Sequence, residues 1–292
     1  MHGNIQASTI DGKESYIYRK PLGVIGSISP WNFPLYLSMR TIAPALGTGN
    51  TIVVKPATQS LVTGGTLIAK LLEEAGLPAG VLNVVVGKSE IIGDYFTGHP
   101  ISRMVSFTGS TPVGRGIGRI AGEGLKKSAL ELGGNNVFIV LDDADVDYAV
   151  DAAIFGRFLH QGQACISVNR IMVHQNLYDE FKTKFTAKAK ELPYGDPLNP
   201  NTVIGPVIDR HSLQRILGVI DKSVQAGAVI ETGNIVHGNV LVPTVGSAVT
   251  KDMPIFHEAI FGPAGGLVTV TGDSEAIELA NATDFGMSGA IL

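Results

Sequence analysis

The sequence predicts an α/β protein built on largely parallel sheets. In its 292 residues, short apolar runs alternate with segments of helical periodicity, and 45% of the residues are hydrophobic while only 16% are charged. Apolar runs of this kind are typical of strands that are covered on both faces. At about 150 residues per domain, the length fits two domains or one large one.

The first residues predict an exposed hairpin. Residues 9–20 are polar and alternate around Asp11-Gly12, which is a turn dipeptide. After Pro21, short apolar runs indicate six buried strands, at 24–28, 51–54, 81–86, 104–107, 137–141 and 171–174. Periodic segments between and after them predict helices at 61–75, 145–160, 176–191 and 210–225. The first of these helices should stop at Gly76, with Pro78 just beyond it.

Glycine is abundant, with 36 residues of 292 against a typical share of about 7%, so several glycines are expected to let the backbone approach a ligand. In parallel sheets, ligands bind at the carboxyl ends of strands. Three polar loops follow predicted strands and are expected to cluster there. They are residues 29–34, 55–58 and 108–114.

Two of these loops contain groups that suit a nucleotide. Gly109 and Gly114 enclose Ser110 and Thr111 between a strand and a helix, so the turn either holds a pyrophosphate or is an ordinary tight turn. A GxGxxG pattern fails nearby because residue 119 is arginine. Lys55 is either a solvated charge at a strand end or a donor to a ribose or phosphate.

Three side chains are candidates for catalysis. Cys165 follows a Gln-Gly-Gln loop that would leave its sulfur accessible among backbone N–H groups, which favours a nucleophile over an inert core thiol. Glu131 stands in an apolar run before two glycines, and a buried acid of this kind suits a general base. Asn32 lies between two prolines and either satisfies the turn backbone or donates to an oxyanion.

Several function classes are excluded. The net charge is −4, the pI is about 6.0, and basic residues are not interleaved with aromatics, so nucleic acid is not expected as a partner. A single cysteine and seven histidines without metal-ligand spacing predict no disulfide and no metal site. The N-terminal residues resemble no secretory signal, and no apolar stretch reaches about 18 residues, which predicts a cytoplasmic protein without a membrane partner.

Six motifs, taken in order, resemble the aldehyde dehydrogenase superfamily, and most closely its bacterial benzaldehyde, vanillin and salicylaldehyde dehydrogenases. The motifs are Pro30-Trp31-Asn32-Phe33-Pro34, Lys55-Pro56, Phe107-Thr108-Gly109-Ser110, Glu131-Leu132-Gly133-Gly134, Gly162-Gln163-Ala164-Cys165 and Phe261-Gly262-Pro263. The resemblance implies an oligomerisation hairpin at 1–21, a Rossmann-like NAD(P)-binding domain at 22–133 and an α/β catalytic domain at 134–292. It also implies a homo-oligomer, a dimer or a tetramer, that uses NAD or NADP to oxidise an aromatic aldehyde to its acid through a cysteine thiohemiacetal and thioester.

The same resemblance implies roles for individual residues. Cys165 is the nucleophile, Asn32 and the Cys165 backbone N–H form the oxyanion hole, and Glu131 activates the hydrolytic water. Lys55 holds the adenine ribose, while Trp31 and Ser110 contact the adenosine and pyrophosphate. The full set of expected cofactor contacts is Ile28, Pro30, Trp31, Lys55, Thr58, Gly109, Ser110, Leu132, Gly133 and Phe261.

The sequence also departs from the family. Members extend beyond both ends of this chain, so we expect a fragment or a shortened gene product. Thr58 stands where the family often has glutamate, and Ala259 replaces the glutamate that grips the nicotinamide ribose. Two rival functions remain: a noncatalytic cofactor-binding or assembly remnant, and a cysteine hydrolase that uses Cys165 with a histidine.

Overall fold

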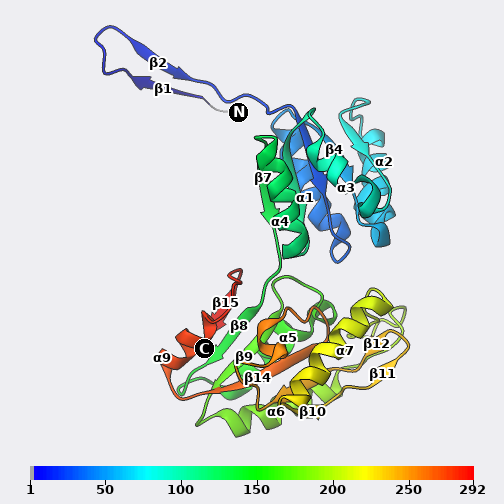
Figure 1. The fold of residues 1–292 in the computed structure, drawn as a ribbon, viewed down its shortest axis with the longest axis vertical. Helices are drawn as coiled ribbons and strands as arrows, with labels where there is room; N and C mark the ends of the chain where they lie inside the picture. The colour runs from blue at the N-terminus through cyan, green and yellow to red at the C-terminus, as the bar shows by residue number, and fades with distance from the viewer. Residues whose placement is uncertain (1–2) are drawn as a thin grey trace. The chain divides into compact units, whose positions relative to one another are not determined.

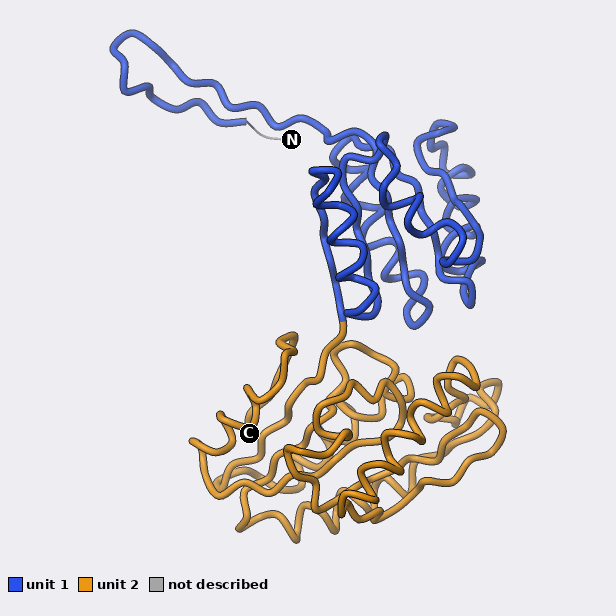
Figure 2. Tube along the Cα trace, in the orientation of Figure 1, with its two compact units in different colours: residues 1–132 blue, residues 133–292 orange. Residues whose placement is uncertain are grey.

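A computed structural model describes residues 3–292. The chain divides into two compact units, residues 1–132 and residues 133–292, which Figure 2 colours separately. Each unit has its own sheet and its own core. No helix among the described residues is both long and apolar enough to cross a bilayer.

The first unit begins with a hairpin of β1 (Asn4–Ala7) and β2 (Glu14–Ile17), antiparallel with Ala7 opposite Glu14. All residues of both strands are exposed. The hairpin turns around Asp11-Gly12 as predicted, but its first strand lies before residue 9. Residues 10–13 are a turn instead, closed by a 3.2 Å hydrogen bond from Lys13 N–H to the Ile10 carbonyl.

The rest of the first unit is built on a parallel five-stranded sheet in the order β5-β4-β3-β6-β7. Figure 1 labels β4 and β7 of this sheet. Its strands are β3 (Val24–Ile28), β4 (Thr51–Lys55), β5 (Leu82–Val84), β6 (Ser102–Thr108) and β7 (Lys127–Glu131). The chain builds from β3 outward to β5, then returns to the other side of β3 for β6 and β7. The loops after β3 and β6 therefore diverge at a topological switch point, where doubly wound sheets bind ligands.

Helices cover both faces of this sheet. They are α1 (Pro34–Gly47), α2 (Leu67–Glu74), α3 (Ser89–Gly98) and α4 (Thr111–Glu123). One core cluster joins Ile25 and Ile52 of the sheet to Ile42 of α1 and Ile68 of α2, and another joins Phe107 to α4. The buried apolar strands thus explain the high hydrophobic content.

The predicted helix at 61–75 begins differently from an ordinary helix. Its first turn, η2 (Val62–Thr66), is π-helical, and α2 follows it. This turn packs closely against the end of β4, since a Cβ on Gly65 would lie 2.7 Å from Pro56 Cγ. The helix ends as predicted, because Gly76 adopts a left-handed φ of 88°.

The second unit is a six-stranded sheet in the order β10-β13-β14-β9-β8-β15, parallel except for the β10–β13 pair. Its strands are β8 (Asn136–Val140), β9 (Val168–His174), β10 (Val229–Thr232), β13 (Thr244–Ser247), β14 (Ala264–Val270) and β15 (Gly289–Ile291). A separate two-stranded ribbon joins β11 (Val236–His237) to β12 (Val240–Leu241). The predicted α/β class with parallel sheets is confirmed in both units.

The helices of this unit are α5 (Val146–Phe158), α6 (Tyr178–Glu191), α7 (Arg210–Gln225), α8 (Pro254–His257) and α9 (Asp273–Ala280). The core around α5 and α6 includes Phe158, Phe181 and Phe185, whose rings stack. The core on the other face includes Ile216 of α7 and Phe256 of α8. The predicted helices at 176–191 and 210–225 are confirmed to within two residues, and the one at 145–160 ends at Phe158.

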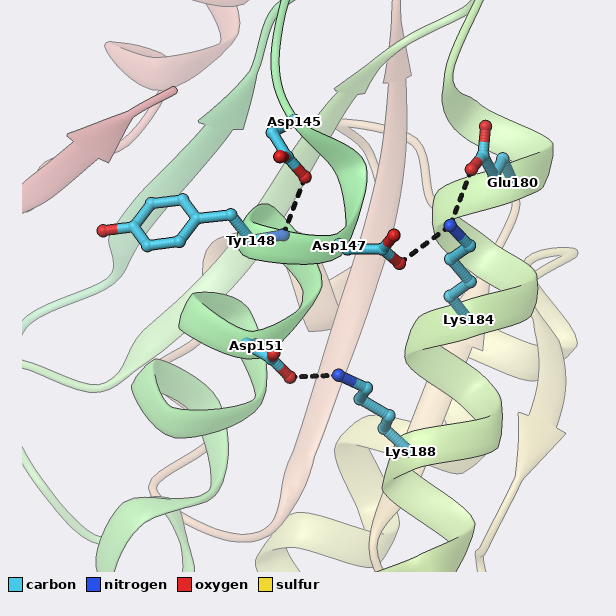
Figure 3. A network of polar contacts seen from close by, with 7 residues as sticks. All are labelled: Asp145, Asp147, Tyr148, Asp151, Glu180, Lys184 and Lys188. Carbon is cyan, nitrogen blue, oxygen red and sulfur yellow. Dashed lines mark hydrogen bonds and ion pairs between the residues drawn. The ribbon is translucent and has the colours of Figure 1, made fainter.

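Charged side chains link the outer surfaces of α5 and α6 (Figure 3). Lys184 reaches Asp147 at 2.7 Å and Glu180 at 2.8 Å, and Lys188 pairs with Asp151. Asp145 caps α5 by accepting a 3.1 Å hydrogen bond from the Tyr148 backbone N–H. The ion pairs to Asp147 and Asp151 thus connect α5 and α6 at the surface, while the stacked phenylalanines pack beneath them.

Candidate active site

The carboxyl ends of the first unit's strands bring the three polar loops together, as predicted. In the sheet register, Ile28 lies opposite both Lys55 and Phe107, and Thr108 lies opposite Glu131. Backbone hydrogen bonds continue past the strand ends, from Ser29 N–H to the Lys55 carbonyl at 3.2 Å and from Gly109 N–H to the Glu131 carbonyl at 3.0 Å. The loops that begin after Ile28, Lys55 and Thr108 therefore share one edge with Glu131.

Lys55 is buried at this edge, with only 1% of its surface exposed. Desolvation by burial lowers the pKa of Lys55, and the charge of Glu90 opposes that shift. Its ammonium donates to the Pro56 carbonyl at 3.4 Å, a long hydrogen bond that leaves donors for other acceptors. The interpretation as a solvated strand-end charge is wrong, and a buried amine directed to polar ligand groups fits the position.

The start of α4 is shaped for a close approach. Ser110 is its N-cap residue in extended conformation, and its side chain makes no capping hydrogen bond. A Cβ on Gly114 would lie 2.3 Å from Leu132 Cδ2, and one on Gly109 would lie 2.4 Å from the Phe107 ring. Glycine at both positions lets the first turn pack tightly against β6 and the end of β7. Helix N-termini present N–H groups and a partial positive charge, which suits a pyrophosphate.

Buried contacts order the loop that carries Asn32. Asn32 is 7% exposed and directly precedes the Phe33-Pro34 start of α1. Ser38 of α1 donates at 2.7 Å to the Gly64 carbonyl and contacts the Ser29 hydroxyl at 2.7 Å. These contacts join α1, which follows Asn32, to Ser29 before it and to the η2 segment.

Glu131 differs from its prediction. Its side chain is 45% exposed, and Oε1 pairs with Arg40 Nη2 at 2.7 Å. The apolar residues before Glu131 predict burial, but Glu131 is the last residue of β7, which is an edge strand of its sheet. The expectation of a buried acid is therefore wrong, and the carboxylate is half-exposed beside a guanidinium.

In the second unit, Cys165 lies in a turn with an unusual backbone. His160, Gln161 and Gly162 have φ values of 53°, 54° and 66°, three left-handed residues in succession. Cys165 itself is half-buried. Two non-glycine residues in this region of φ and ψ are strained, and such strain concentrates at functional sites.

Asn136 at the start of β8 holds the turn on one side. Its Nδ2 donates to the Cys165 carbonyl at 2.7 Å and to the Ser167 carbonyl at 2.9 Å, while its Oδ1 accepts from Ser288 N–H at 3.0 Å. A Cβ on Gly134 would lie 2.3 Å from the Cys165 carbonyl oxygen. Glycine at position 134 therefore allows the chain to pass close against the Cys165 carbonyl.

These segments gather at the amino ends of the second sheet. Cys165 precedes β9, Gly133-Gly134 precedes β8, and Phe261-Gly262-Pro263 precedes β14, and these three strands are adjacent. The expected clustering of the three polar loops at carboxyl strand ends is confirmed in the first unit, and it does not extend to Cys165. The second unit presents its nucleophile from a turn that enters a strand.

The loop around Ala259 is held by its backbone. Arg215 of α7 donates to the Ala259 carbonyl at 3.1 Å and also to the Ile260 carbonyl. Asn169 of β9 donates to the Glu258 carbonyl at 3.0 Å and accepts from Ile260 N–H at 3.3 Å. The loop is thus anchored on both sides of Ala259, which presents a methyl group where the family motif has a carboxylate.

The predicted site residues divide between the units. Ile28, Pro30, Trp31, Asn32, Lys55, Thr58, Gly109, Ser110, Glu131 and Leu132 belong to the first, and Gly133, Cys165 and Phe261 belong to the second. Sequence reasoning missed Arg40, Asn136 and Arg157. A charged residue within the apolar end of a helix, as at position 157, is the signal that could have singled out the last of these.

The whole chain, residues 1–292, matches the aldehyde dehydrogenase family, and the protein belongs to that family. It is 49% identical over 292 residues to benzaldehyde dehydrogenase YfmT of Bacillus subtilis and 48% identical over 293 residues to vanillin dehydrogenase of Corynebacterium glutamicum. Both alignments cover 100% of this chain and 60% of the relative.

Solved structures agree with this assignment. The structure of an NAD-dependent benzaldehyde dehydrogenase from Corynebacterium glutamicum superposes with a TM-score of 0.94 at 48% identity, covering 99% of this chain and 63% of that one. A succinate-semialdehyde dehydrogenase from Burkholderia pseudomallei superposes with a TM-score of 0.97 at 38% identity, covering 99% and 61%. The chain therefore spans about three fifths of the length of the relatives it matches.

Proposed function

We propose that the chain carries the cofactor-binding and nucleophile-bearing parts of an NAD(P)-dependent dehydrogenase that oxidises an aromatic aldehyde to its carboxylic acid. The observation that carries this proposal is Cys165, the sole thiol, half-buried in a strained turn that Asn136 fixes. The substrate class is supported by relatives named for benzaldehyde and vanillin at 48–49% identity.

The first unit fits a dinucleotide. Lys55 supplies a buried ammonium, and Gly109 and Ser110 place the N-terminus of α4 at the same edge. A bound nicotinamide dinucleotide would supply the two-electron acceptor that aldehyde oxidation requires. We assign Ile28, Pro30, Trp31, Thr58, Leu132, Gly133 and Phe261 to the remaining contacts with it.

The chain's own residues account for the acyl chemistry. The Cys165 thiolate forms a bond to the aldehyde carbon, and the carbonyl π electrons move to oxygen. The Asn32 amide and the Cys165 backbone N–H donate to that oxyanion, and donors of this kind are worth about 3 kcal/mol each. After oxidation, Glu131 accepts a proton from water, the water oxygen attacks the thioester carbon, and the carbon–sulfur bond breaks to return the thiolate.

We assign residues 1–21 to oligomer formation, 22–133 to cofactor binding and 134–292 to catalysis. The hairpin supports the first assignment, because an isolated two-stranded hairpin is marginally stable in water. Its apolar side chains Ile5, Tyr16 and Ile17 are exposed at 66%, 55% and 43%. A second copy of the chain that covers these side chains would give a dimer or tetramer.

The test of this proposal asks whether modifying or replacing Cys165 abolishes turnover. With benzaldehyde and either NAD or NADP, we expect the native chain to form reduced nicotinamide. One iodoacetamide adduct per chain, located at Cys165 by mass spectrometry, should abolish that activity. Cys165→Ala should be inactive while it retains native circular dichroism and cofactor binding.

Other outcomes favour the rival functions. A folded native chain that binds cofactor without turning over would be a noncatalytic remnant. Activity that survives in Cys165→Ala would refute the nucleophile. Ester cleavage that needs a histidine and no cofactor would instead support a cysteine hydrolase.

A further inference from the structure

Arg157 is buried at the end of α5 and binds two separate loops. Only 1% of its surface is exposed. Its Nη2 donates to the Gly162 carbonyl at 3.1 Å and to the Gly262 carbonyl at 2.9 Å. Its Nη1 donates to the Val168 carbonyl and to Asn169 Oδ1 at 3.3 Å.

The two loops meet around this guanidinium. Gly162 is the last left-handed residue before Cys165, and Gly262 follows Phe261 at the end of the loop that contains Ala259. A Cβ on Gly162 would lie 2.1 Å from Arg157 Nη2 and 2.4 Å from the Gly262 carbonyl oxygen. The contact is too close for any side chain at position 162. A single nitrogen atom of Arg157 therefore joins the nucleophile turn to the Phe261 loop.

A buried cation here is costly for packing alone. The acceptors named above are neutral backbone and amide oxygens, and Nε has no acceptor within residues 3–292. Burial lowers the pKa of Arg157 to about 9. A hydrophobic side chain of similar volume often stabilises such a position as well or better, so the guanidinium has a use other than filling the core.

We infer that Arg157 is a positioning residue that couples the Cys165 turn to the Phe261 loop through its hydrogen bonds to Gly162 and Gly262. Asn136 fixes the Cys165 carbonyl from β8, and Arg157 fixes Gly162 from α5, so the turn is held at both ends. The catalytic consequence rests on the proposed function, whereas the effect on the thiol does not.

The experiment measures alkylation of Cys165 in the full-length chain. Because Cys165 is the only cysteine, its rate of reaction with iodoacetamide can be followed without cofactor or aldehyde. Arg157→Met removes both the positive charge and the planar guanidinium donors that bind the two loops. Arg157→Lys keeps the charge but cannot donate to both loops in the same planar geometry. Phe181→Leu is the matched control, since it loosens the buried packing of α5 and α6 without touching either loop.

We expect Arg157→Met to slow alkylation about tenfold, because the turn that carries Cys165 loses its hydrogen bonds to α5 and its link to the Phe261 loop, so the sulfur is no longer held in one position. The alkylation rate of Arg157→Lys should lie between those of Arg157→Met and the native chain. Phe181→Leu should be alkylated within about twofold of the native rate, although its Tm is lowered to a similar extent. Partial unfolding acts in the opposite direction because it exposes the thiol, so slower alkylation cannot come from lost folded protein. The difference between Arg157→Met and Arg157→Lys should persist across the pH profile of the alkylation rate.

Turnover gives the second measurement. If the chain is active, kcat of Arg157→Lys should fall about 10²-fold with little change in the cofactor KM, as expected for a displaced nucleophile. If Cys165 in Arg157→Met is alkylated as fast as or faster than in Phe181→Leu, the inference is overturned, even in an active enzyme. Slowed alkylation in a chain without dehydrogenase activity would uphold the inference and reject the proposed function.

Discussion

The Glu131 carboxylate is the residue whose environment most affects the proposed deacylation step. Its partner Arg40 lies on α1, and both side chains are about half-exposed, at 45% and 46%. Exposed ion pairs of this kind are worth about 1 kcal/mol or less. The pair therefore gives the carboxylate a defined resting position without preventing its movement toward a water molecule.

Replacing Glu131 should separate the two halves of the reaction. Oxidation precedes attack by water, so Glu131→Gln should still give a burst of reduced nicotinamide close to one per active site. The steady-state rate should then fall by about 10²–10⁴, the usual contribution of a general base. Rapid-quench or stopped-flow absorbance would measure both phases.

Arg40→Met is the matched control because it removes the ion pair and leaves the carboxylate. Its steady-state rate should stay within about threefold of native, given the small energy of an exposed pair. Equal losses of burst and steady state in Glu131→Gln would mean that Glu131 has a structural role instead.

At the residue scale, local chemistry in the sequence singles out candidates, whereas burial depends on neighbours that the sequence does not reveal. Residue types and flanking loops indicate Cys165, Asn32 and Lys55, and their proposed roles stay predictions. Lys55 stayed ambiguous because a strand-end lysine is solvated or buried according to what packs over it. Glu131 was misjudged because an apolar run does not reveal that its strand lies at a sheet edge.

At the scale of an element, helix α5 has two faces that make different kinds of contact. Its inner face buries Ala149, Val150 and Ala153 and ends at Arg157. Its outer face pairs Asp147 and Asp151 with lysines of α6, as Figure 3 shows. The surface pairs are exposed, so their contribution to stability should be small and sensitive to salt.

Lys184→Met tests that contribution through its pH dependence. Hydrogen bonding and charge from Lys184 lower the pKa of Asp147. A carboxyl group whose pKa is lower in the folded state stabilises the protein at pH values above its unfolded-state pKa, near 3.9. That stability is lost as the pH falls through the folded-state pKa. The Tm of Lys184→Met should therefore lie about 2 °C or less below native at pH 7, and the difference should vanish near pH 2 or in 1 M salt.

Lys190 is exposed on the same helix and supplies the control, since Lys190→Met should leave Tm unchanged at every pH. A Tm difference for Lys184→Met that persists at low pH and in high salt would show that packing of the Lys184 aliphatic stem, and not the charge of its ammonium group, stabilises the helix pair.

Two strands that the sequence did not predict, β14 and β15, share a feature. β14 contains Gly265 and Gly266, and β15 begins at Gly289, whereas glycine is unfavourable in a strand interior. The structure explains the first two by packing, since a Cβ at Gly265 would lie 2.9 Å from Arg157 Cδ and one at Gly266 would lie 3.1 Å from Val249. Close approach by side chains distant in sequence is not visible in local periodicity.

At the scale of the whole molecule, the two sheets present their functional loops from opposite strand ends. The first unit uses carboxyl ends and a helix N-terminus, which suit a phosphate-bearing cofactor. The second uses amino ends and a strained turn that displays a thiol. The α/β alternation predicted both sheets, but no sequence pattern in this chain distinguished the two orientations.

The proposed assignment of cofactor binding to the first unit predicts which residues a bound cofactor should protect from hydrogen exchange. Hydrogen exchange measured by mass spectrometry should show that NADP protects residues 29–34, 55–58 and 109–114 of the first unit. The affinity can be followed separately through quenching of Trp31, the only tryptophan in the chain. Protection confined to the second unit would contradict the assignment of these loops.

The same measurement tests cofactor choice through Thr58. A carboxylate beside the ribose hydroxyls would repel a 2′-phosphate, whereas Thr58 offers a neutral, exposed hydroxyl in the loop that follows Lys55. The native chain should therefore bind NAD and NADP with comparable Kd, and Thr58→Glu should weaken NADP alone by about tenfold, near 1.4 kcal/mol. Gln59→Glu is the control, because it adds the same charge one residue along the 3₁₀ turn η1 (Thr58–Ser60), where successive side chains point about 120° apart. A strong native preference for NAD, or equal weakening of both cofactors by Thr58→Glu, would show that position 58 does not face the 2′ position of the ribose.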